Sequence, residues 1–148
     1  MIFSLVAAVW FSPAMAWAGP MDQPLIRAAY FGDIPAVERL LAAGADIEET
    51  DERGRTPLMW AAYKGRTAVV RLLLSKGARI EAVSRAGVTA LIAAGQGGDP
   101  EVTTLLISRG ANLAAKDYKG RNAGAWAAKR HHSVLAGALG QGITANAK

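Results

Sequence analysis

The only two histidines of the chain, His131 and His132, are adjacent and are the first candidates for acid–base or metal chemistry. Neighbouring side chains on a helix point about 100 degrees apart, so this pair cannot chelate one metal ion as histidines four residues apart can. The chain has no cysteine, which excludes disulfides, thiolate zinc sites and cysteine nucleophiles. We therefore expect a solvated helix end at the histidines and no metal or cofactor.

Three other groups of residues have a weak chemical signal. The glycines of 95–98 resemble a phosphate loop but lack a preceding apolar strand and a Gly-Lys-Ser/Thr ending. The acidic residues of 48–52 match no calcium-binding spacing, so we expect a solvated hairpin tip there. Ser75 and Ser108 have no histidine in register and form no nucleophile–base pair. The sequence predicts that the protein is not an enzyme and has no small-molecule substrate.

The first 21 residues have the features of an export signal. They contain no charged side chain, and an apolar run is interrupted by Pro13. Ala14-Met15-Ala16 and Ala16-Trp17-Ala18 each match a signal-peptidase site. We expect a cleaved signal peptide over residues 1–18, a mature start at Gly19 and a periplasmic or secreted protein. The segment lacks Lys and Arg, which leaves open an uncleaved anchor that would hold the protein at the membrane.

Length and charge limit the rest of the chain. The 148 residues, 51% of them apolar, are enough for one domain or a short repeat array. The net charge of +5 lies downstream of the uncharged N-terminal segment. A basic surface favours an acidic protein, an anionic polymer or a membrane surface as partner.

An internal repeat organises the sequence, and its spacing is 33 residues. Its clearest markers are a leucine, an alanine, a glycine and a Gly-Ala pair, which recur as Leu25, Leu58 and Leu91, as Ala28, Ala61 and Ala94, as Gly32, Gly65 and Gly98, and as Gly44-Ala45, Gly77-Ala78 and Gly110-Ala111. Such units cannot bury their apolar faces alone, so they must stack on one another.

Local chemistry fixes the ends of the helices in each unit. Thr56 can cap a helix whose first turn holds Pro57, and Gly65 can end it with positive φ. Asp99-Pro100 repeats the cap-and-proline arrangement at the following helix. Each unit should therefore contain two short helices that start at fixed points.

The frame that runs from Asp51 through Thr56-Pro57-Leu58 and Gly65 to Gly77-Ala78 closely resembles the ankyrin repeat, over about Asp22 to Leu139. The resemblance implies an all-α solenoid of stacked helix-turn-helix units with short β-hairpin-like loops. It divides the chain into a domain over 19–140 and a flexible tail over 141–148. Within the domain we expect a capping repeat at about 22–50, repeats at 51–83 and 84–116, and a degenerate repeat at 117–140.

The sequence departs from the family pattern in two places, and each departure leads to a prediction. In the last frame Asn122-Ala123-Gly124 replaces Thr-Pro-Leu and His131 replaces the terminating glycine. We therefore expect this repeat to be the loosest, with a short second helix near 134–139. The histidine that often follows Thr-Pro-Leu in the family is absent, so we expect a loss of polar ordering compensated by apolar packing.

The resemblance also implies a binding surface, because ankyrin hairpin tips and first helices form a concave face that holds partners. The residues at these positions are basic and aromatic for the most part: Tyr30, Phe31, Glu52, Arg53, Arg55, Tyr63, Lys64, Arg85, Val88, Gln96, Tyr118, Lys119, Arg121, Lys129 and Arg130. Arginine and aromatic residues dominate binding energy at interfaces, which suits a partner protein with an acidic, partly apolar epitope. Trp60 and Trp126 are expected to be structural.

The sequence thus predicts a monomeric, exported protein-binding module. Two alternatives stay open: a binder of an anionic polymer, either polysaccharide or, less favoured, nucleic acid, and a specific inhibitor or immunity protein of one enzyme. A membrane is expected as a partner only if the N-terminal segment is uncleaved.

Overall fold

A computed structural model describes residues 22–145 of the chain, with side chains up to residue 140. The expected signal peptide, its expected cleavage site and most of the expected first hairpin lie outside the described residues. So do residues 146–148 of the expected tail.

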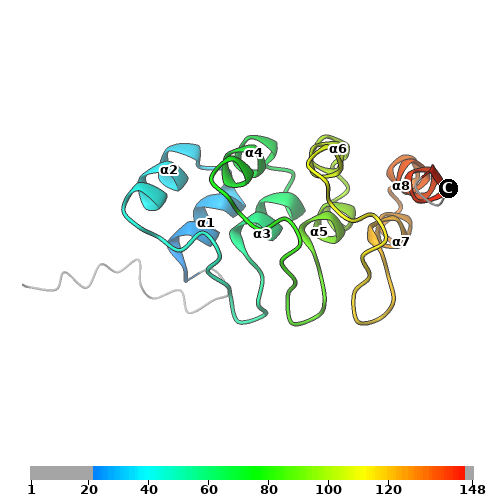
Figure 1. Cartoon of the computed structure of the whole chain (residues 1–148), viewed down its shortest axis with the longest axis horizontal. Helices are drawn as coiled ribbons and strands as arrows, with labels where there is room; N and C mark the ends of the chain where they lie inside the picture. Colours follow the sequence, from blue (N-terminus) through cyan, green and yellow to red (C-terminus); the bar gives the residue numbers. More distant parts are fainter. Residues whose placement is uncertain (1–21, 146–148) are drawn as a thin grey trace, which may run out of the picture.

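The described residues form four helix pairs and no strand. The pairs are α1 (Pro24–Phe31) with α2 (Ile34–Ala42), α3 (Pro57–Tyr63) with α4 (Thr67–Ser75), α5 (Ala90–Gly97) with α6 (Pro100–Ser108), and α7 (Ala123–Lys129) with α8 (Ser133–Ala145). Figure 1 shows them stacked in two rows, with the loops that precede α3, α5 and α7 extending from the same side. Within this part of the chain, no helix is both long enough and apolar enough to span a membrane.

Side-chain caps start the helices where the sequence places them. The side-chain oxygens of Thr56, Thr89 and Asn122 each accept a hydrogen bond from the backbone N–H three residues later, at 3.3, 3.3 and 2.8 Å. Asp33 and Asp99 do the same at α2 and α6, both at 3.0 Å. Because the caps recur in register, α3, α5 and α7 each begin at the same point of their repeats.

Close packing of the first helices forms the core of the stack. α1, α3, α5 and α7 contact one another in series, and the second helices contact their neighbours less. A Cβ atom on Gly95 would overlap the carbonyl oxygen of Ala123, and one on Gly97 would overlap that of Tyr63. The glycines of 95–98 therefore serve helix packing.

Backbone hydrogen bonds also join the hairpins of consecutive repeats. The N–H of Arg85 donates to the carbonyl oxygen of Arg53, and the N–H of Tyr118 donates to that of Ala86, both at 3.0 Å. The three hairpins are thereby held side by side as one row (Figure 1).

The last repeat differs from expectation at its second helix. His131 takes the place of the terminating glycine and adopts that glycine's backbone conformation, with φ of 63°, alone among the non-glycine residues described. The helix that follows is not confined to 134–139: α8 extends over Ser133–Ala145. Part of the segment expected to be a flexible tail is therefore helical. Residues 133–145 contain no proline, and Ile143-Thr144 stand at the positions where the earlier repeats have their helix-ending Gly-Ala pair.

Candidate protein-binding surface

A buried carboxylate fixes the hairpin of the repeat 51–83. Asp51 is only 6% exposed. One carboxylate oxygen accepts hydrogen bonds from the backbone N–H groups of Arg53 and Arg55, both at 2.8 Å. The other accepts the indole N–H of Trp60 on α3 at 2.9 Å. The hairpin is thereby attached to the first helix of its own repeat, and we call this arrangement an Asp–Trp unit.

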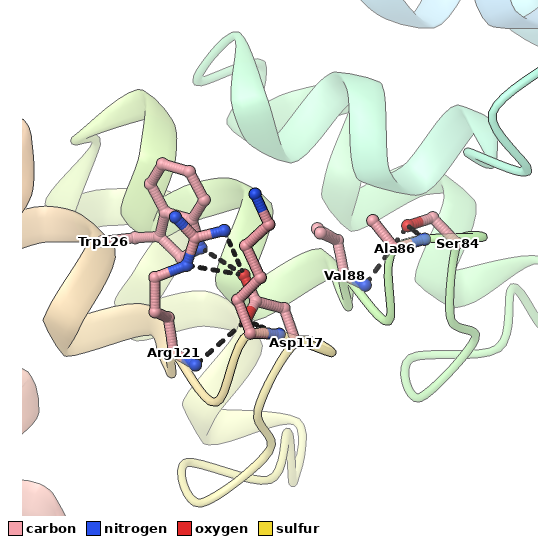
Figure 2. Close-up of polar contacts among 7 residues, drawn as sticks. Ser84, Ala86, Val88, Asp117, Arg121 and Trp126 are labelled. Atoms are coloured by element: carbon pink, nitrogen blue, oxygen red, sulfur yellow. Dashed lines mark hydrogen bonds and ion pairs between the residues drawn. The ribbon is translucent and has the colours of Figure 1, made fainter.

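A second Asp–Trp unit lies in the last repeat, two repeats along the stack (Figure 2). Asp117 accepts hydrogen bonds from the backbone N–H groups of Lys119 and Arg121 and from the indole N–H of Trp126, all at 2.9 Å. The guanidinium of Arg121 also forms an ion pair with it at 3.0 Å. Burial opposes ionisation, but these hydrogen bonds outweigh it and lower the pKa of Asp117 from 3.8 to about 2.

The repeat between them has a reduced version of the unit, which Figure 2 also shows. Ser84 stands at the aspartate position, and its hydroxyl accepts hydrogen bonds from the backbone N–H groups of Ala86 and Val88 at 3.2 Å. Ala93 stands at the position of the tryptophan, so α5 has no indole N–H that could donate a hydrogen bond to this hairpin. The middle repeat thus keeps the hairpin turn but lacks the carboxylate, the arginine and the tryptophan of the Asp–Trp units, whose positions hold Ser84, Val88 and Ala93.

These contacts correct two expectations. Polar ordering is not lost with the missing family histidine, because the Asp–Trp units supply it in two repeats. Val88, expected on the binding face, is buried with 8% exposure. It occupies the position of Arg55 and Arg121, but its short apolar side chain packs into the core instead of reaching the surface.

An aromatic cluster covers the N-terminal part of the same face. Tyr30 has edge contacts with Phe31 and Trp60, at centroid distances of 5.1 and 5.5 Å, and Trp60 contacts Tyr63 at 5.9 Å. Two cations lie on these rings. The guanidinium of Arg55 is 4.7 Å from the Trp60 ring, and the Lys64 ammonium is 4.6 Å from that of Tyr30.

The C-terminal part of the face repeats the pairing of cations with an indole. Arg121 and Lys129 lie 4.0 and 5.5 Å from the centre of the Trp126 ring. Tyr118 is 77% exposed at the hairpin tip. The Tyr118 ring packs against Gly87 of the preceding hairpin. A Cβ on Gly87 would lie 2.8 Å from this ring, so a side chain there would displace it.

Comparison with known proteins identifies the architecture. A family profile described as ankyrin repeats, three copies, matches residues 25–117. The chain belongs to the ankyrin-repeat family. Ankyrin repeats are generally protein–protein interaction modules, and the proteins built from them are typically non-enzymatic. A search of curated proteins found no match.

The ankyrin stack places most of the proposed binding residues on its surface. The exposed ones are Phe31, Glu52, Arg53, Lys64, Arg85, Tyr118, Lys119, Lys129 and Arg130, and the half-buried ones are Tyr30, Arg55, Tyr63, Gln96 and Arg121. The structure brings these residues together as two groups of cations. We call Arg53, Arg55, Lys64 and Arg85 the N-terminal cationic cluster, and Lys119, Arg121 and Lys129 the C-terminal cationic cluster.

The two aspartates that organise these clusters were not among the binding residues predicted from the sequence. Asp51 and Asp117 lie 66 positions apart, and in both repeats a tryptophan follows the aspartate after nine residues and an arginine after four. This recurrence, absent from the middle repeat, is a signal that a comparison of the frames can detect.

The acidic residues of 48–52 are not a solvated tip, with the exception of Glu52. The Glu48 carboxylate accepts a hydrogen bond from the N–H of Arg79 at 2.6 Å, and that of Glu49 accepts one from Ile26 at 3.1 Å. Burial raises the pKa of Glu49, and the backbone hydrogen bonds oppose this only in part. Over the part of the chain that the structure describes, no three acidic or histidine side chains gather as a metal site would require.

A hollow of about 370 Å³ lies between the ends of α3 and α5. Tyr63, Lys64, Gly97 and Asp99 are among the residues that line it. The repeats 51–83 and 84–116 therefore meet at a recess beside the N-terminal cationic cluster.

Proposed function

We propose that the protein is an exported, non-enzymatic module that binds another protein through the concave face of its ankyrin stack. The observation that carries this proposal is that cations from the hairpins and from the ends of the first helices lie on aromatic rings in two separate repeats. Rigid aromatic and arginine side chains are the residues that most often anchor a partner. Export, to the periplasm or beyond the cell, is supported by the signal-like segment 1–18; an uncleaved segment would anchor the module at the membrane instead.

The charge on this face indicates the chemistry of the partner. Arg53, Arg85 and Lys119 are exposed on the hairpins, and among the described residues the ion pair of Arg121 with Asp117 is the single one formed. The cations of the hairpin tips are therefore available to an acidic, partly apolar epitope. We expect the module to act as a monomer.

Charge reversal on the concave face tests the proposal. The variant carries Arg53→Glu, Arg85→Glu and Lys119→Glu; Arg121 is left intact because its reversal would place two carboxylates together. A matched control carries Arg71→Glu, Lys76→Glu and Arg109→Glu, all exposed on or just after α4 and α6. Both variants change the net charge equally.

Affinity capture from the exported fraction of the source cells supplies the measurement. Wild type and control should retain the same partner, identified by mass spectrometry, and the concave variant should lose it while its thermal stability stays unchanged. Equal capture by both variants would remove the concave face from the proposal.

The net charge of +5 supports one other candidate, a binder of an anionic polymer. Its affinity would fall steeply with salt and would depend little on which face carries the reversed charges. Heparin and DNA titrations at several salt concentrations distinguish it from a protein binder. An inhibitor or immunity protein would differ from the main proposal only in the identity of its partner.

A further inference from the structure

We infer that the concave face holds an extended acidic segment of the partner, with two carboxylate side chains six residues apart. This inference rests on the proposed function and specifies the partner's chemistry. One carboxylate would meet the N-terminal cationic cluster, and the other would meet the C-terminal cationic cluster. The chain between them would cross the middle repeat.

Charged and uncharged side chains alternate from repeat to repeat along the row of hairpins. Arg53 and Lys119 occupy equivalent positions in repeats that carry an Asp–Trp unit, and Ala86 occupies the same position between them. Arg55 and Arg121 likewise flank Val88. The cations are thus repeated two units apart with an uncharged gap.

Arg85 is the cation of the middle hairpin, and it belongs to the N-terminal side of the gap. Its backbone N–H bonds to Arg53, and its side chain lies over Gly54, where a Cβ would come within 3.2 Å of it. Both contacts direct it toward the preceding repeat. The gap therefore remains between this residue and Lys119.

The spacing of the repeats sets the spacing of the carboxylates. Helices pack at about 8–10 Å, so equivalent positions two repeats apart are separated by about 16–20 Å. An extended chain advances about 3.3 Å per residue, which gives about five or six residues. Because alternate side chains face the same way, six residues rather than five place both carboxylates toward the protein.

The middle repeat offers space for an apolar side chain between the two acids. Ala86 and Gly97 are exposed and small, and Val88 and Ala93 below them are buried. The cation–aromatic pairs on either side are bulkier, so these four residues of the middle repeat form a low, uncharged floor between them. A partner residue such as leucine, placed midway between the acids, can lie on this floor.

Synthetic peptides with a fluorescent label test the inference on the purified protein. Each peptide contains two glutamates in a neutral Ser/Thr background with a leucine between them, and only the spacing of the glutamates varies, from three to eight residues. Fluorescence anisotropy at low ionic strength gives the affinity. We expect the peptide with six-residue spacing to bind about three- to fivefold more tightly than that with three-residue spacing, the range of one exposed charge pair.

Three variants and one matched control make the measurement specific. Arg53→Gln and Lys119→Gln should each remove the preference for six-residue spacing, whereas the matched change Arg71→Gln should preserve it. Ala86→Arg adds a cation in the gap and should improve binding of the peptide with three-residue spacing.

Two results would overturn the inference. Affinities that do not depend on spacing would show a response to charge alone, and no binding of any peptide at millimolar concentration would exclude an extended acidic segment. In either case the concave variant could still lose its natural partner in affinity capture. The proposed function would then stand without this specification of the partner.

Discussion

Asp51 and Asp117 are the residues that join hairpin to helix in this protein. Each accepts hydrogen bonds from two backbone N–H groups of its hairpin and from an indole N–H. A buried carboxylate is costly unless its oxygens are hydrogen-bonded, and here both are. The aspartates therefore stabilise the fold and also set the positions of the cations that follow them.

Asp117 should make the free energy of unfolding depend on pH in the acidic range. Its pKa is about 2 in the folded protein against an ordinary 3.8, so the folded state favours the carboxylate. The stabilisation of about 2 kcal/mol is present above pH ~4 and is lost as the pH falls towards 2. Asp117→Asn should lower the free energy of unfolding by about this amount at pH 7 and by much less near pH 2.

Urea unfolding followed by circular dichroism over this pH range measures the difference. Glu49 titrates in both proteins, so its opposite contribution cancels. Glu52→Gln, which changes an exposed carboxylate, is the control and should have little effect at any pH. A difference between wild type and Asp117→Asn that is constant with pH would contradict the prediction.

Trp60 and Trp126 should differ in their contributions to stability. Trp60→Phe leaves one oxygen of the buried Asp51 without its hydrogen bond, which should cost about 1–3 kcal/mol. Trp126→Phe should cost less, since Asp117 keeps its ion pair with Arg121 and the indole is only half buried. Urea unfolding measures the free energy of unfolding of both variants. A larger loss for Trp126→Phe than for Trp60→Phe would contradict the prediction.

At the scale of the helix, small residues set the distance between neighbouring repeats. α5 lies between α3 and α7, and its glycines contact the backbone of both. The same α5 carries the uncharged floor of the concave face. Close packing and the shape of the proposed binding surface are therefore two results of one short, glycine-rich helix.

Gly95→Ala should separate α5 from α7. The added Cβ would overlap the carbonyl oxygen of Ala123, which belongs to the backbone and cannot turn away, so we expect a loss of about 1–3 kcal/mol. Gly137→Ala is the matched change in α8, where no atom lies within 4 Å of the new Cβ. It should stabilise the protein by up to about 1 kcal/mol. Urea midpoints that shift in the same direction for both variants would contradict this account.

At the scale of the whole molecule, the stack is less closely packed at its C-terminal end. α8 contacts α7, but a cleft of about 350 Å³ separates it from α6. Val134 in this cleft is 88% exposed. Repeat proteins are stabilised by contacts between neighbouring repeats, so a missing contact lowers the local stability.

Amide hydrogen exchange should therefore be fastest at the C-terminal end of the stack. We expect the amides of α8 to exchange through openings at least about 1 kcal/mol less costly than those of α5, which is packed on both sides. Native-state exchange followed by NMR or mass spectrometry measures the order. Equal protection of α5 and α8 would show that the stack opens as a single unit.

The repeat length, most of the helix starts and the ankyrin fold could be predicted from the sequence alone. These follow from local rules: a capping side chain, a proline in the first turn and a glycine with positive φ act within a few residues of where they stand. The basic and aromatic composition of the concave face was also visible from the repeat frame.

Which of those residues reach the surface depends on how the repeats stack. Val88 is buried where Arg55 and Arg121 reach the surface, and Asp51 is enclosed where a solvated carboxylate was expected. Burial at each hairpin depends on side chains of the next repeat and of the following helix, which local patterns do not specify. The uncharged gap between the two cationic clusters takes its width from the stacking, because stacking places residues 33 positions apart side by side and residues 66 positions apart on either side of the middle repeat.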